Sequence, residues 1–489
     1  MNHAADNARK YEQPTKNSQA ADRARIAAIL NKLQPAKNPS YEASDIGDGR
    51  LFADVFKDRA RFVPERKAWF VYDGRVWSND VSGLSTMALC KTLAKELLTY
   101  SASIEDDKLR GIYLKHVQRW QRRQTRETIL RDARDVYPIS AKEFDIDPFL
   151  INCENGTVNV KTGIFSPHRS EDLLTKLAPV NYDPSARCER FDRFISEITS
   201  GDRDKAIFLQ KCFGYGATGD TSRECMFILY GATSRNGKGT LCETVLNVLG
   251  SYACASNPET IAQKTGRDSS RPSEDIARLF GIRFANISEP PKGMTLDAAK
   301  VKTMTGRDTL NARFLNENSF DFKPHFKLFI NTNHSLLVDD ASLFASDRVI
   351  LIPFDRHFSE SERDTGLKDE FAKPQNQSAI LNWLIAGYQM LCTDGFRQPE
   401  AVRDAIEEYR FESDKIAQFV KESMTPDADG EIRTTDVYHA YQIWCSANDC
   451  PRESPKSFNT LIRSHATIVR RRPRSGGEKT SLLVGFKLK

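Results

Sequence analysis

Hydrophobic and polar positions change their spacing several times along this chain of 489 residues. In the segment AWFVYDGRVWSND, the pair Asp73-Gly74 separates two aromatic-rich runs. This pattern predicts a β-hairpin, because glycine tolerates the positive φ of a tight turn. A second hairpin is predicted around Asn155-Gly156 in FLINCENGTVNVKTGIF. Between the two hairpins, from about Thr86 to Ala133, the apolar positions recur at helical spacing.

The central part of the chain alternates short apolar runs with helical patterns. The apolar runs predict strands at Cys225–Tyr230, Arg283–Ile287, Lys327–Asn331 and Arg348–Pro353. Strands that alternate with helices usually form a mostly parallel sheet covered on both faces. We therefore predict an α/β fold here.

The last 60 residues have a pattern of their own. A helix is predicted to begin at Thr434-Thr435, and a second at about Ser457–Ser464. Two apolar runs joined by a basic Gly-Gly segment follow, which indicates a hairpin. Two helices followed by a hairpin favour a winged-helix domain.

These patterns divide the chain into five parts. The first 50 residues are polar and low in aromatic side chains, so we expect a flexible arm there, with one possible helix at Ala20–Leu33. The other parts are an N-terminal α+β region (51–186), the α/β core with a helical lead-in (187–360), a helical segment (361–425) and the C-terminal domain (430–489).

The composition, 39% hydrophobic and 28% charged, is typical of a globular protein. Apolar runs such as Met226–Tyr230 are too short to cross a bilayer, and the N-terminus lacks the apolar core of a signal peptide. We therefore expect a cytosolic protein that does not enter a membrane. Ten cysteines without a CxxC pair or zinc-like spacing predict buried core residues rather than a metal centre.

The net charge of +5 is unevenly distributed. From Glu431 onward, eleven Lys and Arg residues face five Asp and Glu residues, and a second basic stretch runs from Lys108 to Arg134. Each stretch could be an ordinary solvated face. Each could also meet a polyanion.

The segment FILYGATSRNGKGTLCETVLNVL places a glycine-rich loop between a buried strand and a helix. Such a loop brings backbone N–H groups close to phosphate oxygens, and the helix dipole and a lysine add positive potential. The alternative is a glycine-rich turn with an incidental lysine. We predict that the loop binds ATP through Gly231, Asn236, Gly237, Lys238, Gly239 and Thr240.

This loop departs from the strict phosphate-loop pattern in two ways. Five residues rather than four separate Gly231 from Gly237. Gly239 follows the lysine, so the hydroxyl that usually binds Mg²⁺ comes one position late, at Thr240.

Three polar residues lie at the ends of later predicted strands. Glu289 could orient Mg²⁺ or activate the attacking water, but Ser288 stands where many ATPases have a second acid. Asn333 could position the water, and Arg348 could reach the nucleotide of a neighbouring subunit. Taken singly, they could be a strand cap, a turn residue and a salt-bridge partner.

The order of these pieces resembles superfamily 3 helicases. It looks most like the helicase part of phage and plasmid primase-helicases and of poxvirus-type nucleoside triphosphatase-primases. The matching segments are LYGATSRNGKGT, FANISEP, VKTMTGRDTLNARF with FDFKPHFKLFINTNH, and SDRVILIPF. Upstream, WFVYDGRVW and INCENGTVNVKTG resemble the region that accompanies this helicase core.

The resemblance implies an AAA+-like ATPase that assembles as a ring, usually a hexamer, and moves 3′ to 5′ on DNA. Lys238 would be the Walker A lysine, Thr240 and Glu289 the Mg²⁺ ligands, Asn333 the sensor and Arg348 the finger acting in trans. A hairpin lining the channel would grip phosphates through Arg313, Lys323 and Lys327.

In the C-terminal domain, a basic wing could follow the backbone of a duplex through Arg470, Arg471, Arg472 and Arg474. The alternatives are a solubilising hairpin and a surface that docks a primase.

The sequence as a whole therefore predicts an ATP-dependent helicase for replication of a phage, plasmid or other mobile element in a bacterial cytoplasm. It would act on single-stranded and forked DNA. About 50 polar residues before the core cannot hold a primase domain, so a separately encoded primase or polymerase is expected. One alternative is a DNA-stimulated ATPase that melts an origin or loads other proteins without processive unwinding. A scaffold with a decayed loop is the other.

Overall fold

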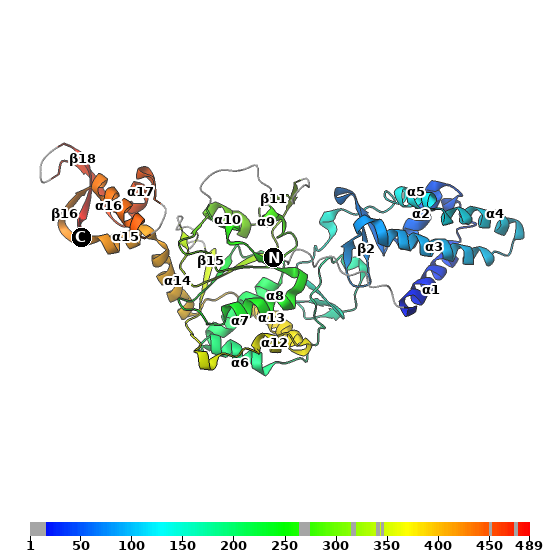
Figure 1. Cartoon of the computed structure of the whole chain (residues 1–489), viewed down its shortest axis with the longest axis horizontal. Coiled ribbons are helices and arrows are strands. Elements are labelled where there is room, and N and C mark those ends of the chain that lie inside the picture. The colour runs from blue at the N-terminus through cyan, green and yellow to red at the C-terminus, as the bar shows by residue number, and fades with distance from the viewer. Residues whose placement is uncertain are drawn as a thin grey trace. The chain divides into compact units, whose positions relative to one another are not determined.

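The computed structural model describes residues 16–263, 274–313, 319–338, 343, 347–448, 452–473 and 478–489. The chain divides into two compact units (Figure 1). Unit 1 comprises residues 1–146 and 167–176, and unit 2 comprises residues 147–166 and 177–489.

Unit 1 combines a helical cluster with a small antiparallel sheet. Its α-helices are α1 (Lys16–Leu33), α2 (Asp45–Phe56), α3 (Leu84–Ala102), α4 (Asp107–Gln118) and α5 (Arg123–Asp132). Its strands are β1 (Ala60–Val63), β2 (Ala68–Tyr72) and β3 (Trp77–Asn79), in that order across the sheet. The helices and strands share one apolar core around Phe52, Trp69, Leu97 and Trp120.

The first predicted hairpin is confirmed by β2 and β3, which pair antiparallel. Gly74 has φ +104° in the turn, and the Asp73 carboxylate accepts the amides of Arg75 and Val76 at 2.8 Å. The helical stretch is confirmed too, as three helices with breaks between them. Strand β1 was not predicted from the sequence.

The expectation of a flexible arm over residues 1–50 is wrong for its described part. Helix α1 carries Ile26 and Leu30, four residues apart on one face, and both are fully buried in the unit 1 core. Ser44 caps α2 by accepting the amide of Gly47. A few well-spaced apolar side chains therefore fold this polar segment; residues 1–15 lie outside the described residues.

Unit 2 is built on a five-stranded parallel sheet with the order β15-β7-β13-β9-β8. The strands are β7 (Met226–Tyr230), β8 (Ala253–Ser256), β9 (Phe284–Ser288), β13 (Lys327–Thr332) and β15 (Val349–Pro353). The four predicted strands are confirmed, and β8 is an addition. The mixed α/β fold with a parallel sheet is as predicted.

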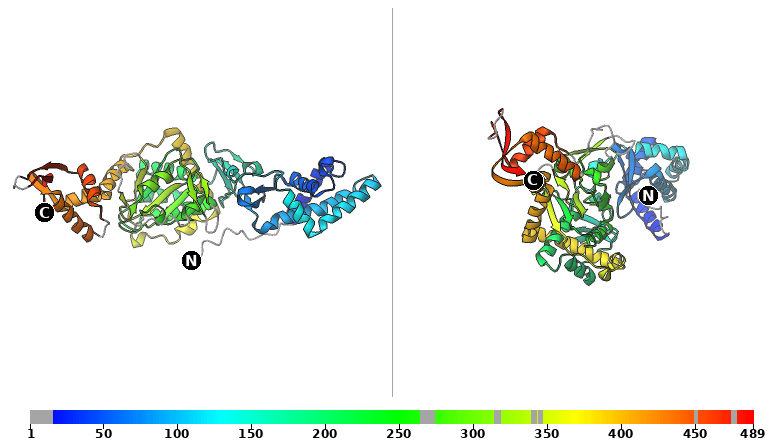
Figure 2. Two further views of the ribbon diagram at one scale, coloured as in Figure 1. Left: turned by 90° about the horizontal axis from the view of Figure 1, so that it is seen from above. Right: turned by 60° about the vertical axis from the view of Figure 1, so that its left-hand side comes forward.

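Both faces of this sheet are buried, because successive residues of each strand enter different cores. Phe227 and Leu229 face the core shared with α6 (Glu189–Ile198), α7 (Arg203–Ala217), α8 (Lys238–Leu249) and α13 (Pro374–Asp394). Met226 and Ile228 face the core shared with α10 (Ala298–Thr305) and α14 (Glu400–Ser413). Figure 1 shows α7, α8 and α13 together on one side of the sheet, and Figure 2 gives two further views of the same ribbon.

The second predicted hairpin is confirmed by β4 (Leu150–Cys153) and β5 (Gly156–Asn159), which a short strand β6 (Phe165–Ser166) extends. This hairpin belongs to unit 2, so the predicted region 51–186 runs across the boundary between the units. Contacts distant in sequence hold it there: the Asn152 amide donates to the Tyr252 hydroxyl at 3.0 Å.

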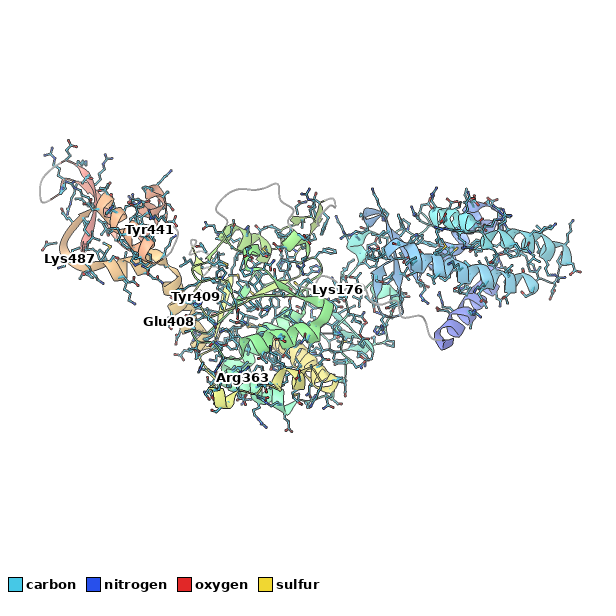
Figure 3. All side chains as sticks on the ribbon, in the orientation of Figure 1. Lys176, Arg363, Glu408, Tyr409, Tyr441 and Lys487 are labelled. Carbon is cyan, nitrogen blue, oxygen red and sulfur yellow. The ribbon has the colours of Figure 1, made fainter. Side chains whose placement is uncertain are left out.

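The C-terminal domain begins earlier than the predicted residue 430. It contains α15 (Lys415–Ser423), β16 (Met424–Arg433), α16 (Thr434–Ala447), α17 (Pro455–Leu461), β17 (Thr467–Arg471) and β18 (Thr480–Leu488). The strands form an antiparallel sheet in the order β16-β18-β17. The two helices and the final hairpin are confirmed. Phe419 of α15 packs against Phe458 and against Tyr441, which Figure 3 labels, so α15 belongs to the same core.

The segment between the sheet and this domain is helical, as predicted, with α12 (Leu367–Phe371), α13 and α14. Throughout the described ranges, we find no helix with the length and apolar character needed to span a bilayer.

Candidate nucleotide site

Three of the predicted site residues follow directly after parallel strands. Strand β13 pairs Thr332 with Tyr230 of β7, and Asn331 with Ser288 of β9. Gly231, Glu289 and Asn333 are the next residues along each strand. They therefore lie at one edge of the sheet, beyond the carboxyl ends of neighbouring strands, where α/β folds place their ligands.

The loop from β7 to α8 needs two of its glycines for steric reasons. Gly237 has φ +85°, and a Cβ there would lie 2.3 Å from Cγ2 of Ile198. A Cβ on Gly231 would lie 2.5 Å from the carbonyl oxygen of Phe354. Gly237 precedes α8 without supplying a side-chain cap, so amides of its first turn can meet an anion.

Lys238 begins α8 and points back across the loop. Its ammonium donates to the Asn333 side-chain oxygen at 2.8 Å and to the Gly231 carbonyl at 3.3 Å. The residue is only 2% exposed. Burial lowers the pKa of Lys238 to about 8, because both of these acceptors are uncharged and neither offsets the loss of water.

The remaining loop residues differ in what they can offer a nucleotide. Asn236 is buried and donates to the Thr233 carbonyl at 2.6 Å, so it braces the loop. Gly239 is exposed and Thr240 half-buried in the first turn of α8. A Cβ on Gly239 would have ordinary contacts, so packing does not explain the glycine that follows Lys238.

Glu289 follows β9 and leaves its side chain exposed. Its φ is +51°, and its amide donates to the Asn331 carbonyl at 2.9 Å. A left-handed conformation is unusual for glutamate and marks a backbone held by its neighbours. The preceding Ser288 accepts the side-chain amide of Asn286 at 2.8 Å.

Thr240 and Glu289 are the oxygen donors that could hold Mg²⁺ at this edge. Nowhere in the described ranges do three or more His, Cys, Asp or Glu side chains cluster as a metal site. A small number of protein oxygens suits Mg²⁺, which usually shares its coordination with substrate phosphates and water. The donor set therefore fits a metal that arrives with a nucleotide.

Arg348 lies at the other end of the sheet. It precedes β15, whose first residue, Val349, pairs with the first residue of β7. Its guanidinium forms an ion pair with Glu224 and donates to the Thr305 hydroxyl at 3.0 Å. A five-residue strand spans about 16 Å, so Arg348 cannot serve the phosphate loop of its own chain.

A cavity of about 530 Å³ adjoins the loop at Gly237 and Thr240. Its other walls come from α6 and from the segment that follows β15, which includes Phe358 and Arg363; Figure 3 labels Arg363. Three contacts fasten this segment to the loop: the Phe358 amide donates to the Arg235 carbonyl, His357 contacts the Ser234 carbonyl at 2.8 Å, and Arg235 pairs with Glu360 at 2.8 Å. These residues were not predicted from the sequence, in which the dense charges of DRHFSESERDTG are the local signal.

The predicted hairpin strands are present as β11 (Leu310–Ala312) and β12 (Phe320–Phe322), which pair antiparallel, and their place in a channel stays a prediction. Arg313 and Lys323 flank it and are exposed. The prediction for Lys327 as a phosphate-gripping residue is wrong. Lys327 is 2% exposed, and its ammonium donates to the carbonyls of Thr218, Asp220 and His325.

The basic wing is described in part. Arg470, Arg471 and Arg472 are exposed on and just after β17, and Arg471 forms an ion pair with Glu431 of β16. Arg474 lies outside the described residues.

Two regions of the chain match protein families. Residues 49–200 match the family described as "D5 N terminal like". Residues 411–485 match the one described as "Poxvirus D5 protein-like". Residues 49–200 and 411–485 of this chain are thus similar to D5-type proteins.

Relatives of this D5-like chain occur in large DNA viruses. "Putative helicase 022R" of Frog virus 3 is 24% identical over 462 residues, which cover 77% of this chain and 45% of the relative. A protein of Acanthamoeba polyphaga mimivirus, also named a putative helicase, is 23% identical over 66% of this chain and 36% of its own length. A putative primase of African swine fever virus is 21% identical over 46% of this chain and 25% of its own length. The chain thus spans less than half the length of these curated relatives.

Among solved structures, the C-terminal region of NrS-1 (305–718) is similar to this D5-like chain. The match covers 90% of this chain and 99% of the NrS-1 region, at 10% sequence identity and a TM-score of 0.43. This likeness is too distant to support a statement about the site.

Proposed function

We propose that this D5-like chain is an ATP-driven motor that separates the strands of DNA during replication. Its core would be an AAA+-like phosphate-loop ATPase, and its C-terminal domain a winged helix. The observation that carries the proposal is the meeting of Lys238, Glu289 and Asn333 at one edge of the parallel sheet.

In this proposal, each residue at the edge has a separate task. The first amides of α8 and the Lys238 ammonium hold the phosphates of ATP and draw charge toward them. Asn333, which contacts Lys238 in the free chain, exchanges that contact for the attacking water or the γ-phosphate. Glu289 orients the water. Bound Mg²⁺, held by Thr240 and Glu289, would neutralise charge on the phosphates.

The cavity beside Gly237 and Thr240 is where we place the base and ribose. Its volume of about 530 Å³ lies in the range of small-molecule sites. Phe358 offers a ring on which a base can stack, and Arg190 and Glu197 offer polar contacts. Hydrolysis would loosen the contacts between Ser234, Arg235 and the segment after β15.

The position of Arg348 supports assembly of several copies. Because it lies at the edge opposite its own phosphate loop, it can contribute to hydrolysis only in a neighbouring subunit. We propose a closed ring, with a hexamer as the expected size, in which Arg348 of one subunit completes the site of the next.

The nucleic-acid contacts follow from the exposed cations. Arg313 and Lys323, which flank the hairpin β11–β12, would hold single-stranded DNA in the channel. Arg470 and Arg472 on the wing would hold duplex. Relatives named as helicases and as a primase support a replication role, and a primase partner is part of the proposal.

A strand-displacement assay tests the proposal. Forked DNA with a labelled strand is incubated with the chain, ATP and Mg²⁺; separation is expected with ATP and not with a non-hydrolysable analogue. Substrates with only a 3′ or only a 5′ tail give the polarity, for which we expect 3′ to 5′. Hydrolysis that DNA stimulates, without displacement of any strand, would instead support the origin-melting or loading ATPase.

A further inference from the structure

Helix α4 of unit 1 presents an exposed basic face. Lys108, Lys115 and Arg119 are exposed, at spacings of seven and four residues. These spacings bring all three onto one side of the helix, and Arg122 continues the same side just beyond it. From Lys108 to Arg119 this face is about 16 Å long. We call these four residues the α4 basic face.

The surrounding sequence is as basic as the face itself. From Lys108 to Arg134 the chain contains nine Lys and Arg residues and two Asp and Glu residues. The acids at the start of α4 are used locally: Asp106 caps the helix by accepting the Leu109 amide, and Asp107, its first residue, forms an ion pair with Arg110. They do not neutralise the face.

Within the described ranges, Lys108, Lys115 and Arg122 form no ion pair. Arg119 pairs with Asp45 at 3.6 Å, with both side chains about half exposed. A pair so open to water contributes little and is easily exchanged. The opposite side of the helical segment, with Tyr113, Val117 and Trp120, is buried in the unit 1 core. The contacts that stabilise unit 1 therefore do not explain why the outer side of α4 carries these cations.

We propose that the α4 basic face binds the phosphate backbone of double-stranded DNA. Duplex DNA carries one charge for about every 1.7 Å of its axis, so a face of this length meets several phosphates. A single strand is the weaker fit, because its binding depends on exposed aromatic rings on which bases stack. The aromatic residues of this segment, Tyr113 and Trp120, are at most 8% exposed.

The proposal rests on the proposed function only in the choice of DNA as the polyanion. Unit 1 would hold the duplex ahead of the strands being separated, as a contact that needs no ATP. The chain would thus have a second duplex-binding surface, distinct from the wing of the C-terminal domain.

The test compares two charge-matched triple variants of the full chain, without ATP. One is Lys108→Gln, Lys115→Gln, Arg122→Gln; the control is Lys57→Gln, Lys91→Gln, Lys95→Gln, which removes three exposed lysines elsewhere in unit 1. Binding of a blunt 20-base-pair duplex is measured by fluorescence anisotropy across a series of salt concentrations. Thermal unfolding verifies that both variants are folded.

We expect the first variant to bind at least tenfold more weakly at 100 mM salt. The plot of log K against log salt should become less steep, by about 0.9 in the magnitude of its slope for each lost phosphate contact. The control should keep the parental slope. An unchanged slope in the first variant, or an equal loss in both, would overturn the proposal.

Two further outcomes are informative. If the first variant keeps its affinity for duplex but loses binding of a poly-glutamate peptide, the face binds an acidic protein and the DNA proposal is wrong. The variant Lys238→Ala should keep full duplex binding. Loss of ATPase activity with an intact salt slope would therefore separate failure of the motor from failure of this surface.

Discussion

The ammonium of Lys238 lies 2.8 Å from the side-chain oxygen of Asn333. The two residues are 95 positions apart in the sequence. They meet because β7 and β13 are adjacent parallel strands in register, and each residue belongs to the turn or helix start that follows its strand. A neutral oxygen thus lies beside the lysine, where phosphate is expected to bind.

Replacing Asn333 tests this contact. Asn333→Ala should bind ATP normally but hydrolyse it on the order of 100-fold more slowly, as expected when one preorganised polar group is lost. Asn333→Asp keeps the shape but puts a carboxylate against Lys238, so it should also weaken ATP binding through repulsion of the phosphates. Binding of a fluorescent ATP analogue and the rate of phosphate release distinguish the two variants. Equal affinity in both would contradict a phosphate position near this pair.

The pKa of Lys238 predicts proton uptake on nucleotide binding. Burial lowers this pKa to about 8 in the folded chain, from 10.5. Between these values the folded chain binds fewer protons than the unfolded chain, so its stability should rise with pH across this window. Bound phosphate raises the pKa again, so ATP binding should take up a proton.

Calorimetric titrations in two buffers with different ionisation enthalpies measure this uptake. We expect almost no proton uptake at pH 7, where the lysine is already protonated. At pH 9 the uptake should approach one proton for each ATP bound. The affinity for ATP should fall as the pH rises above 8. Uptake that does not change between pH 7 and pH 9 would show that phosphate does not bind beside Lys238.

Arg348 leads to a prediction about mixed assemblies. Arg348→Ala and Glu289→Gln should each bind ATP and fail to hydrolyse it. When equal amounts are mixed, about one interface in four joins an intact Glu289 to an intact Arg348, and activity should return at those interfaces. The measurement is phosphate release as a function of the mixing ratio, with Lys238→Ala in place of Glu289→Gln as a second pairing. If phosphate release does not recover at any mixing ratio, Arg348 does not act in trans.

The wing predicts a separate contribution to duplex binding. Substituting glutamine for Arg470, Arg471 and Arg472 should lower the salt slope by about two, because Arg471 is already partly neutralised by Glu431. Lys487→Gln on β18 is the matched control (Figure 3). Charge removal is a better test than deletion of residues 430–489, which would remove strands and helices that pack on α15. The same slope in all three proteins would exclude a DNA-binding wing.

The sequence predicted those features whose causes are local. The hairpin at Asp73-Gly74 depends on one turn, and the strands β7, β9 and β13 on short apolar runs. Once parallel strands were expected, the polar residues after them were expected to meet. The structure confirms that Glu289 and Asn333 follow β9 and β13, and their roles stay predictions.

Features that depend on distant contacts were missed. Lys327 resembled a surface cation, but its ammonium donates to the carbonyls of Thr218 and Asp220, more than 100 residues away, and burial lowers its pKa. A helix over Ala20–Leu33 was considered possible, but the sequence did not predict that buried Ile26 and Leu30 hold α1 against the unit 1 core. The segment that closes the cavity beside the loop had no recognisable pattern, because its contacts are to a segment more than 100 residues away, and two of the three are to backbone atoms there.

The central claim is that ATP is hydrolysed at the loop that contains Lys238. The most direct measurement is the steady-state rate of phosphate release by the parent chain and by Lys238→Ala, with and without single-stranded DNA. The account predicts release by the parent that DNA stimulates, and at least a 100-fold loss in the variant, which should remain folded. Equal rates in the two proteins, or no release by the parent with DNA present, would contradict it.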